Sequence, residues 1–165
     1  MLYRISGISA EGCIEFIRTD QPQPGLEKPV CDSHVGIEVS VLIPFYRDNP
    51  VPLLMALTEE IAAGELPVEV VLFDDGEPDP ELNASVATAV DSLPAPARLL
   101  TARRNVGRAA GRNRLASAAI GDWQLFLDAD MTVTDGFLKT WLGLICAYEF
   151  DAAFGGYTAD PVQQK

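Results

Sequence analysis

From residue 37 onward, short apolar runs alternate with stretches that have the length and polarity of helices. The runs are rich in β-branched residues and almost continuously apolar, which is typical of strands buried on both faces of a parallel sheet. The expected strands are 39–43, 68–73, 98–102, 123–127 and 152–157, and the expected helices are 50–63, 80–93, 107–120 and 134–150. With right-handed crossovers, this order predicts an α/β fold with a doubly wound, mostly parallel sheet.

Residues 1–36 do not follow this alternation. They contain two short apolar stretches, 2–5 and 13–17, which we expect to be short strands, and then a loop rich in proline. The whole chain of 165 residues has the length of one ordinary domain. We therefore expect an N-terminal appendage and linker over 1–36 and one α/β domain over 37–165.

The overall charge is strongly acidic, with a formal net charge of -12 at pH 7. Such a charge disfavours nonspecific adhesion to nucleic acid, so we expect no nucleic-acid partner. The three cysteines have neither zinc-type nor redox-type spacing and predict no disulfide framework, as in a reducing cytosol. No apolar run approaches the length that spans a bilayer. We expect a cytoplasmic protein, either free or peripheral to the inner face of the membrane.

Arginines interrupt this acidity in one window. Six of the 12 basic residues lie from Arg98 to Arg114, and no acid lies among them. A helix that begins near Gly107 would offer unpaired backbone N–H groups, and arginines supply forked donors that suit phosphate oxygens. These features favour a diphosphate partner. The alternative is a solvated basic face that pairs with neighbouring acids, to which we assign Arg98 and Arg114.

Asp128 and Asp130 follow an apolar run that should be a buried strand. Two carboxylates at that point are costly without a counterion. In an extended segment, residues two apart point the same way, so both carboxylates can face one ion. Mn²⁺ or Mg²⁺ suits this arrangement, because phosphate oxygens and water can complete its coordination shell. The alternative is a capped turn.

Asp74 and Asp75 end the second expected strand in the same way and are followed by Gly76, which suits a tight turn. One member of the pair is suited to capping the helix that follows. The other carboxylate can accept hydrogen bonds from a nucleobase edge or a ribose, since carboxylates are strong acceptors.

Four motifs, taken in order, resemble a known family. They are VSVLIPFY at 39–46, VVLFDDG at 70–76, NVG through GRN across 105–113, and FLDAD at 126–130. Their order and spacing are similar to those of family 2 glycosyltransferases, which have the Rossmann-like GT-A fold. The resemblance extends over residues 37–157 and is more specific than any of the four motifs alone.

The resemblance implies a binding site for a nucleoside diphosphate sugar. Pro44 and Tyr46 would border the nucleobase, and Asp75 would contact it. Arg112 would lie near the base or the diphosphate. Together with the residues inferred above, the expected nucleotide-sugar-binding set is Pro44, Tyr46, Asp74, Asp75, Gly107, Arg112, Asp128 and Ala129.

The resemblance also implies a metal-dependent reaction. Asp130 would ligate Mn²⁺ or Mg²⁺, and Asp128 would meet the ribose or a metal-bound water. Together with the argument from strand geometry above, this leads us to expect both Asp130 and Asp128 as metal ligands. The implied activity is the inverting transfer of a sugar from a nucleoside diphosphate sugar, most often a uridine one, to an acceptor hydroxyl. A saccharide or lipid-linked acceptor, as in cell-surface polysaccharide biosynthesis, would be the second substrate.

The chain departs from the family pattern at two positions and in its length. Arg47 stands where the family usually carries Asn, and Glu77 stands where Ser is common. In the family, the acceptor-side half with the acidic general base follows the strand expected at 152–157, whereas this sequence ends at Lys165. We expect a chain truncated after its fifth strand, which binds the donor, lacks an assignable general base, transfers little sugar alone and self-associates through its apolar face.

Three other functions remain open. A haloacid-dehalogenase-type phosphatase also has an apolar strand followed by Asp-x-Asp-x-Thr, as at 128–132, but that motif opens its fold. A receiver-like signalling module also has paired acids, but they follow its first and third strands. A non-catalytic nucleotide-binding module would keep the binding site without the chemistry.

Overall fold

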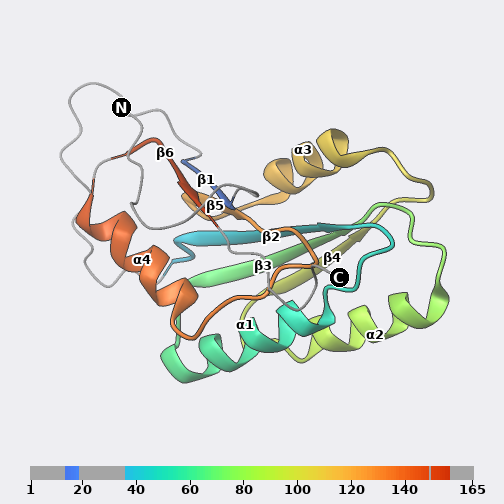
Figure 1. Ribbon diagram of the computed structural model, residues 1–165, viewed down its shortest axis with the longest axis horizontal. Coiled ribbons are helices and arrows are strands. Elements are labelled where there is room, and N and C mark those ends of the chain that lie inside the picture. The colour runs from blue at the N-terminus through green and yellow to red at the C-terminus, as the bar shows by residue number, and fades with distance from the viewer. Residues whose placement is uncertain (1–13, 19–35, 149, 157–165) are drawn as a thin grey trace, which may run out of the picture.

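The computed structural model describes residues 14–18, 36–148 and 150–156. Its strands form a six-stranded sheet in the order β4-β3-β2-β5-β1-β6 (Figure 1). The strands are β1 (Ile14–Arg18), β2 (Val39–Phe45), β3 (Val68–Asp74), β4 (Ala97–Thr101), β5 (Trp123–Phe126) and β6 (Ala152–Gly155). The helices are α1 (Val51–Gly64), α2 (Pro80–Asp91), α3 (Arg108–Ala118) and α4 (Phe137–Ala147).

Strands β2 to β5 form the parallel part of the sheet. β2 pairs with β3 and β5, and β3 pairs with β4. Helices α1, α2 and α4 pack on one face of the sheet, and α3 packs on the other (Figure 1). This arrangement confirms the predicted α/β fold with a doubly wound, mostly parallel sheet. The strand expected at 2–5 and the last residue of the strand expected at 152–157 lie outside the described residues.

Strand β1 belongs to this sheet, and this differs from the expected N-terminal appendage. It pairs antiparallel with β5 on one side and with β6 on the other. The apolar run at 13–17 correctly indicated a strand. Its partners were not predictable from local pattern, because β5 and β6 lie more than a hundred residues further along the chain.

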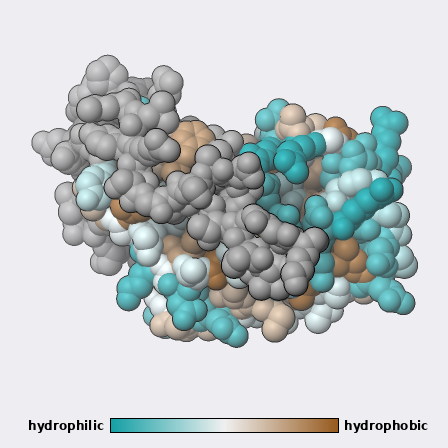
Figure 2. Space-filling view, viewed as in Figure 1, coloured by the Kyte–Doolittle hydropathy of each residue, from teal (hydrophilic) through white to brown (hydrophobic). Residues whose placement is uncertain are grey.

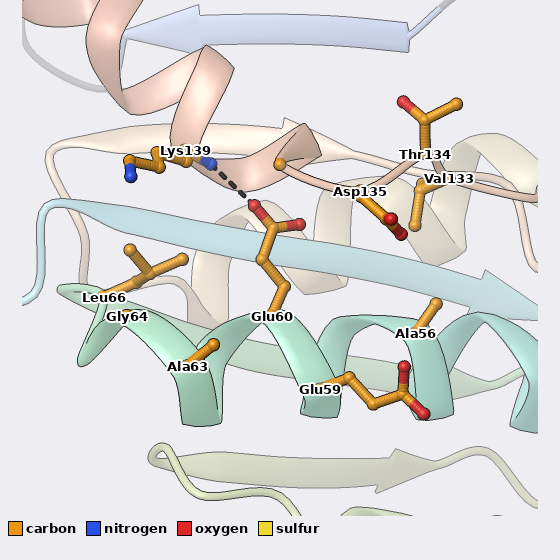
Figure 3. Close-up of a pocket in the computed structure, with 11 residues that line it drawn as sticks. Ala56, Glu59, Glu60, Ala63, Gly64, Leu66, Val133, Thr134, Asp135 and Lys139 are labelled. Carbon is orange, nitrogen blue, oxygen red and sulfur yellow. Dashed lines mark hydrogen bonds between the residues drawn. The ribbon is translucent and has the colours of Figure 1, made fainter.

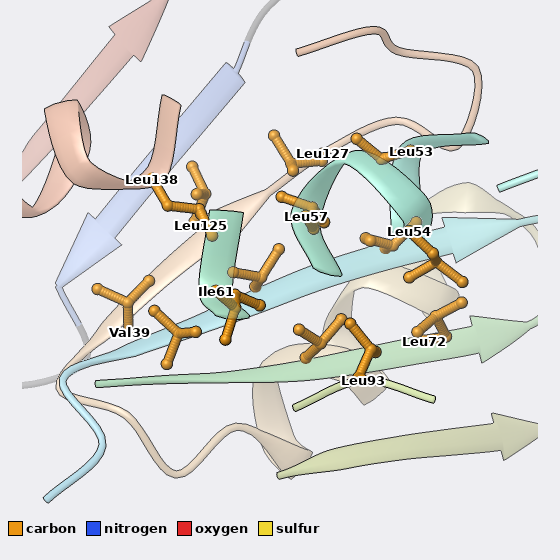
Figure 4. Packing of buried hydrophobic residues seen from close by; sticks show 14 of the residues in the cluster. Val39, Leu53, Leu54, Leu57, Ile61, Leu72, Leu93, Leu125, Leu127 and Leu138 are labelled. Atoms are coloured by element: carbon orange, nitrogen blue, oxygen red, sulfur yellow. The ribbon is translucent and has the colours of Figure 1, made fainter. Parts of the chain in front are cut away.

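Core side chains alternate between the two faces of the sheet, as the two-residue period of a strand requires. In β2, Val41 and Ile43 belong to the larger core cluster, whereas Leu42 belongs to the cluster under α3. Figure 4 shows Leu57 of α1 lying over the sheet, and Leu57 belongs to the larger cluster together with Leu125 of β5. Buried side chains thus pack on both faces of the strands from which the loops leave.

A buried polar cluster lies at the amino end of the parallel strands. Glu69 is 1% exposed and accepts hydrogen bonds from Ser40 Oγ at 2.5 Å and from the Ile120 N–H at 2.8 Å. Its second carboxylate oxygen pairs with the Arg98 guanidinium at 2.7 Å. A buried carboxylate requires partners of this kind. Arg98 therefore pairs with an acid, as expected, at the end of the sheet opposite to the predicted site.

Cys146 is disulfide-bonded, so the expectation that the cysteines form no disulfide was wrong. Cysteine spacing along the chain did not reveal this, because a disulfide depends on which residues the fold brings together.

Among the described helices, none combines the length and the apolar character that crossing a membrane demands.

Candidate functional site

The carboxyl ends of β2, β3, β4 and β5 lie along one edge of the sheet, which we call the carboxyl edge. The loops that leave it are 46–50, 75–79, 102–107 and 127–136. Ligands of open α/β sheets bind outside this edge. Every predicted site residue lies in one of these loops, near the end of one of these strands, or in the first two turns of α3.

Asp75 holds the start of α3 in place. Its side chain is buried, and its Oδ1 accepts a hydrogen bond from the Val106 N–H at 2.6 Å while Oδ2 accepts one from the Gly107 N–H at 2.9 Å. Gly107 has a φ of 91°, a backbone conformation that favours glycine. Both carboxylate oxygens of Asp75 thus already accept a hydrogen bond from the chain, which leaves each of them one further lone pair.

Asp74 shapes the turn after β3. It is 3% exposed, and its Oδ1 accepts a hydrogen bond from the Glu77 N–H at 2.6 Å. Neither Asp74 nor Asp75 caps α2, because the N-cap is Asp79, whose side chain accepts a hydrogen bond from the Glu81 N–H at 2.9 Å. The capping role that we assigned to one of the pair was therefore wrong.

Gly76 packs the loop after β3 against the loop after β4. Its φ is 79°, and a Cβ added there would lie 2.6 Å from the carbonyl carbon of Arg104 and 2.7 Å from the Asn105 nitrogen. These neighbours are backbone atoms, which cannot turn aside as a flexible side chain can. A glycine is required because no side chain fits between the two loops.

Glu77 joins the loop after β3 to the loop after β2. One carboxylate oxygen accepts a hydrogen bond from the backbone N–H of Arg47, and the other accepts one from the Asp79 N–H at 3.0 Å. Arg47 has a φ of 63°, and its guanidinium carbon lies 5.1 Å from the centroid of the Tyr46 ring. Both Arg47 and Glu77 depart from the family pattern, but the sequence did not predict the contact between them.

Arg112 and Asp128 bring α3 and the end of β5 together. An Arg112 guanidinium nitrogen lies 3.1 Å from Asp128 Oδ1, and the two side chains are 21% and 33% exposed. The guanidinium carbon also lies 5.4 Å from the centroid of the Phe126 ring. The structure thus places two predicted site residues in direct contact, at a position that solvent reaches.

The Asp128–Asp130 segment is a turn, whereas we expected an extended segment. Strand β5 ends at Phe126, and the Met131 N–H donates to the Asp128 carbonyl at 3.2 Å. Ala129 is buried, so only its backbone can contribute to a site, and Asp130 is exposed. The last paired residue of β5 is Phe126, opposite Leu42 of β2, although the Leu127 N–H still donates to the Leu42 carbonyl at 3.0 Å.

The donor atoms of this turn suit a hard divalent cation. Carboxylate oxygens are the ligands that Mg²⁺ and Mn²⁺ prefer. Within the ranges that the structure describes, no group of three or more His, Cys, Asp or Glu residues could hold a metal. Asp128 and Asp130 could supply at most part of the coordination shell of such a cation, whose other ligands would be phosphate oxygens and water.

Basic side chains lie around the same edge. Arg103, Arg104 and Arg108 are exposed and flank the start of α3. Figure 2 shows hydrophilic residues gathered over α3 and the loop that precedes it, toward the right of the view. Arg114 instead places its guanidinium carbon 5.4 Å from the centroid of the Phe73 ring, whereas the partners that we expected for it were neighbouring acids.

A separate hollow of about 410 Å³ lies between α1 and the start of α4 (Figure 3). Glu60 points across it, and its Oε1 accepts a hydrogen bond from the Lys139 N–H at 2.9 Å. The hollow contains none of the predicted site residues. Its lining residues are Ala56, Glu59, Glu60, Ala63, Gly64, Leu66, Val133, Thr134, Asp135, Gly136 and Lys139.

Comparison with protein families matches residues 40–164 to the model of glycosyl transferase family 2. A curated relative is the glycosyltransferase AglD of Haloferax volcanii, which is 27% identical over 139 residues. That match covers 81% of this chain and 22% of AglD.

Solved structures share the fold. The S. aureus TarS structure has a TM-score of 0.50 at 26% identity, and the match covers 64% of this chain and 19% of TarS. The mannosyltransferase PcManGT from Pyrobaculum calidifontis, in complex with GDP-Man and Mn²⁺, has a TM-score of 0.51 at 20% identity over 64% of this chain and 32% of that one. The chain thus spans about a fifth to a third of the length of the proteins it matches.

Proposed function

Because this chain belongs to glycosyl transferase family 2, we propose that its carboxyl edge binds the nucleoside diphosphate sugar donor of a glycosyltransferase. One observation carries the proposal. The residues expected for the donor and the metal are far apart in the sequence, yet the fold brings them to one edge of the sheet, and the family match includes all of them. The same match leaves the phosphatase and receiver-like alternatives without support.

The proposed arrangement gives each part of the donor its own group of residues. Pro44 and Tyr46 border the base at the end of β2, and Asp75 and Gly107 fix the loop that faces it. Arg112 donates hydrogen bonds to the diphosphate, because its forked guanidinium suits phosphate oxygens and is accessible to solvent. The exposed arginines beside α3 add positive potential in a chain of net charge -12.

The metal-binding residues in this proposal are Asp130 and Asp128. When bound, Mn²⁺ or Mg²⁺ would neutralise the negative charge that develops on the departing diphosphate. The presence of GDP-Man and Mn²⁺ in the mannosyltransferase structure of similar fold supports this donor class and this type of ion. We propose a uridine donor, inversion at the transferred carbon, and a saccharide or lipid-linked acceptor.

Thermal unfolding tests the proposal. The protein is heated with UDP, GDP, CDP or dTDP, with Mn²⁺ or with a chelator. Ligand at about 100 times its Kd should raise the unfolding midpoint by about 5–10 °C. We expect a Mn²⁺-dependent rise with UDP that the Asp130→Asn variant loses. Asp135→Asn, an exposed aspartate in the same loop, serves as the control and should keep the rise. No rise with any nucleoside diphosphate would refute the proposal.

A further inference from the structure

Arg47 and Glu77, the two positions that depart from the family pattern, contact each other. The Arg47 N–H donates a hydrogen bond to the Glu77 carboxylate, across a sequence separation of 30 residues. The contact joins the loop after β2 to the loop after β3 at the carboxyl edge. The two departures therefore form one structural unit.

The backbone of Arg47 adopts a conformation that its side chain does not favour. Its φ of 63° lies in the left-handed region, where Asn and Gly are the common residues. An Asn at this position, as the family usually carries, would remove much of that strain. Arg47 therefore costs the fold some stability, and a functional role for its side chain would account for that cost.

Glu77 is a rigid support for that strained residue. Its carboxylate also accepts the Asp79 N–H at 3.0 Å, and its own N–H donates to Asp74 Oδ1 at 2.6 Å. Its carbonyl accepts a hydrogen bond from the Asn83 side chain at 3.0 Å. Because Glu77 is fixed at its carboxylate, its N–H and its carbonyl, it can hold the backbone of Arg47 in one position.

The side chain of Arg47 lies over an aromatic ring. Its guanidinium carbon is 5.1 Å from the centroid of Tyr46, and Arg47 is exposed whereas Tyr46 is half-buried. At this distance the guanidinium makes a cation–π contact with Tyr46, and its planar form lets it stack on a second ring as well. Nucleobases stack on arginine planes and on aromatic side chains in the same way.

We propose that Arg47 is a stacking surface for the nucleobase of the donor, beside Tyr46 and with Glu77 as its positioning residue. This inference rests on the proposed function, because it requires a nucleoside diphosphate at the carboxyl edge. It assigns base recognition to a residue that the family pattern does not carry. The diphosphate is bound elsewhere, beside Arg112.

Isothermal titration with UDP, GDP and inorganic pyrophosphate, each with Mn²⁺, tests the proposal. Arg47→Asn should weaken the binding of both nucleotides by about tenfold, as the loss of one base-stacking group does. Its affinity for pyrophosphate should not change, and its unfolding midpoint should stay equal or rise, because Asn tolerates the left-handed conformation. This opposite effect on affinity and stability separates a binding role from a structural one.

Variants of Glu77 test the positioning role. Glu77→Ala should weaken nucleotide binding by a smaller factor than Arg47→Asn, and Glu77→Gln, which keeps an acceptor oxygen, should restore it. Arg114→Gln and Glu81→Gln are the matched controls, since both side chains are exposed and lie outside the proposed site. Both should bind UDP as the wild type does.

The outcomes separate this inference from the proposed function. If the wild type binds UDP or GDP and Arg47→Asn binds it equally well, the stacking role of Arg47 is wrong and the proposed function stands. An equal loss of nucleotide and pyrophosphate binding in Arg47→Asn also overturns the inference. If the wild type binds neither UDP nor GDP and its unfolding midpoint does not rise with CDP or dTDP either, both proposals are wrong.

Discussion

At the scale of single residues, Gly76 should be the least replaceable glycine of the site. Gly76→Ala combines a positive φ with a backbone contact of 2.6 Å. We expect a loss of about 2–4 kcal/mol in the free energy of unfolding, from the strained φ and the overpacking together. Chemical denaturation followed by circular dichroism measures this loss.

Two other glycines separate the strain from the clash. Gly136 has a φ of 76° with nothing within 4 Å of an added Cβ, and Gly143 lies within α4 with the same open space. Gly136→Ala should therefore lose only about 1–2 kcal/mol. Gly143→Ala should gain about 0.5–1 kcal/mol. If Gly76→Ala lost no more than Gly136→Ala, the close packing of the two loops would be contradicted.

The sequence indicated where the residues of the candidate site lie relative to the strands, but not which partners they contact. Asp75 was correctly placed after β3. The apolar run before it and the glycine after it are local signals that predict the end of a strand. Its bonds to Val106 and Gly107 span 31 and 32 residues, so no local pattern could reveal them. The same holds for Arg112, whose partner Asp128 lies in another element. Local pattern thus predicts where a side chain leaves the sheet, whereas its partners depend on the assembled loops.

At the scale of elements, the start of α4 depends on a side chain from α1. Gly136, its N-cap residue, offers no side chain, and Glu60 accepts the Lys139 N–H in its place (Figure 3). Replacing an N-terminal capping acceptor by Ala costs about 1 kcal/mol. Glu60→Ala should lower the free energy of unfolding by that amount and increase hydrogen exchange in the first turn of α4.

The neighbouring Glu59 provides the matched control. It lies on the same helix, and in Figure 3 its side chain points away from α4. Glu59→Ala removes the same charge, so it should change stability by less than about 0.5 kcal/mol, as exposed substitutions usually do. Equal effects of the two variants would show that the capping contact contributes nothing to stability.

The elements themselves were largely predictable because their signals are local. β3 begins at Val68 and α2 at Pro80, as expected. The start of α4 was placed at residue 134, but the helix begins at Phe137, because Gly136 adopts a positive φ that ends the preceding turn. The insertion of β1 between β5 and β6 was missed, since strand pairing across the chain is not encoded in a five-residue run.

At the scale of the whole molecule, the two faces of the sheet are covered unequally. Among the described helices, α1, α2 and α4 cover one face and α3 alone covers the other. The smaller cluster contains Leu115 of α3 against Phe73, Phe126 and Leu42. Helix α3 also carries Arg112 and begins beside Gly107, so the side of the site proposed for the diphosphate depends on the smaller core.

This asymmetry predicts that two equal core deletions will differ in their effect on binding. Leu57 of α1 and Leu115 of α3 are both fully buried, and Leu→Ala at either position should cost about 2–5 kcal/mol. Leu115→Ala loosens the one helix that carries Arg112, so it should also weaken UDP binding by about three- to tenfold. Leu57→Ala lies under the opposite face and should bind UDP as the wild type does, measured by titration well below both unfolding midpoints. Equal losses of UDP affinity in the two variants would mean that the sheet responds as one rigid body and that α3 has no separate influence on the site.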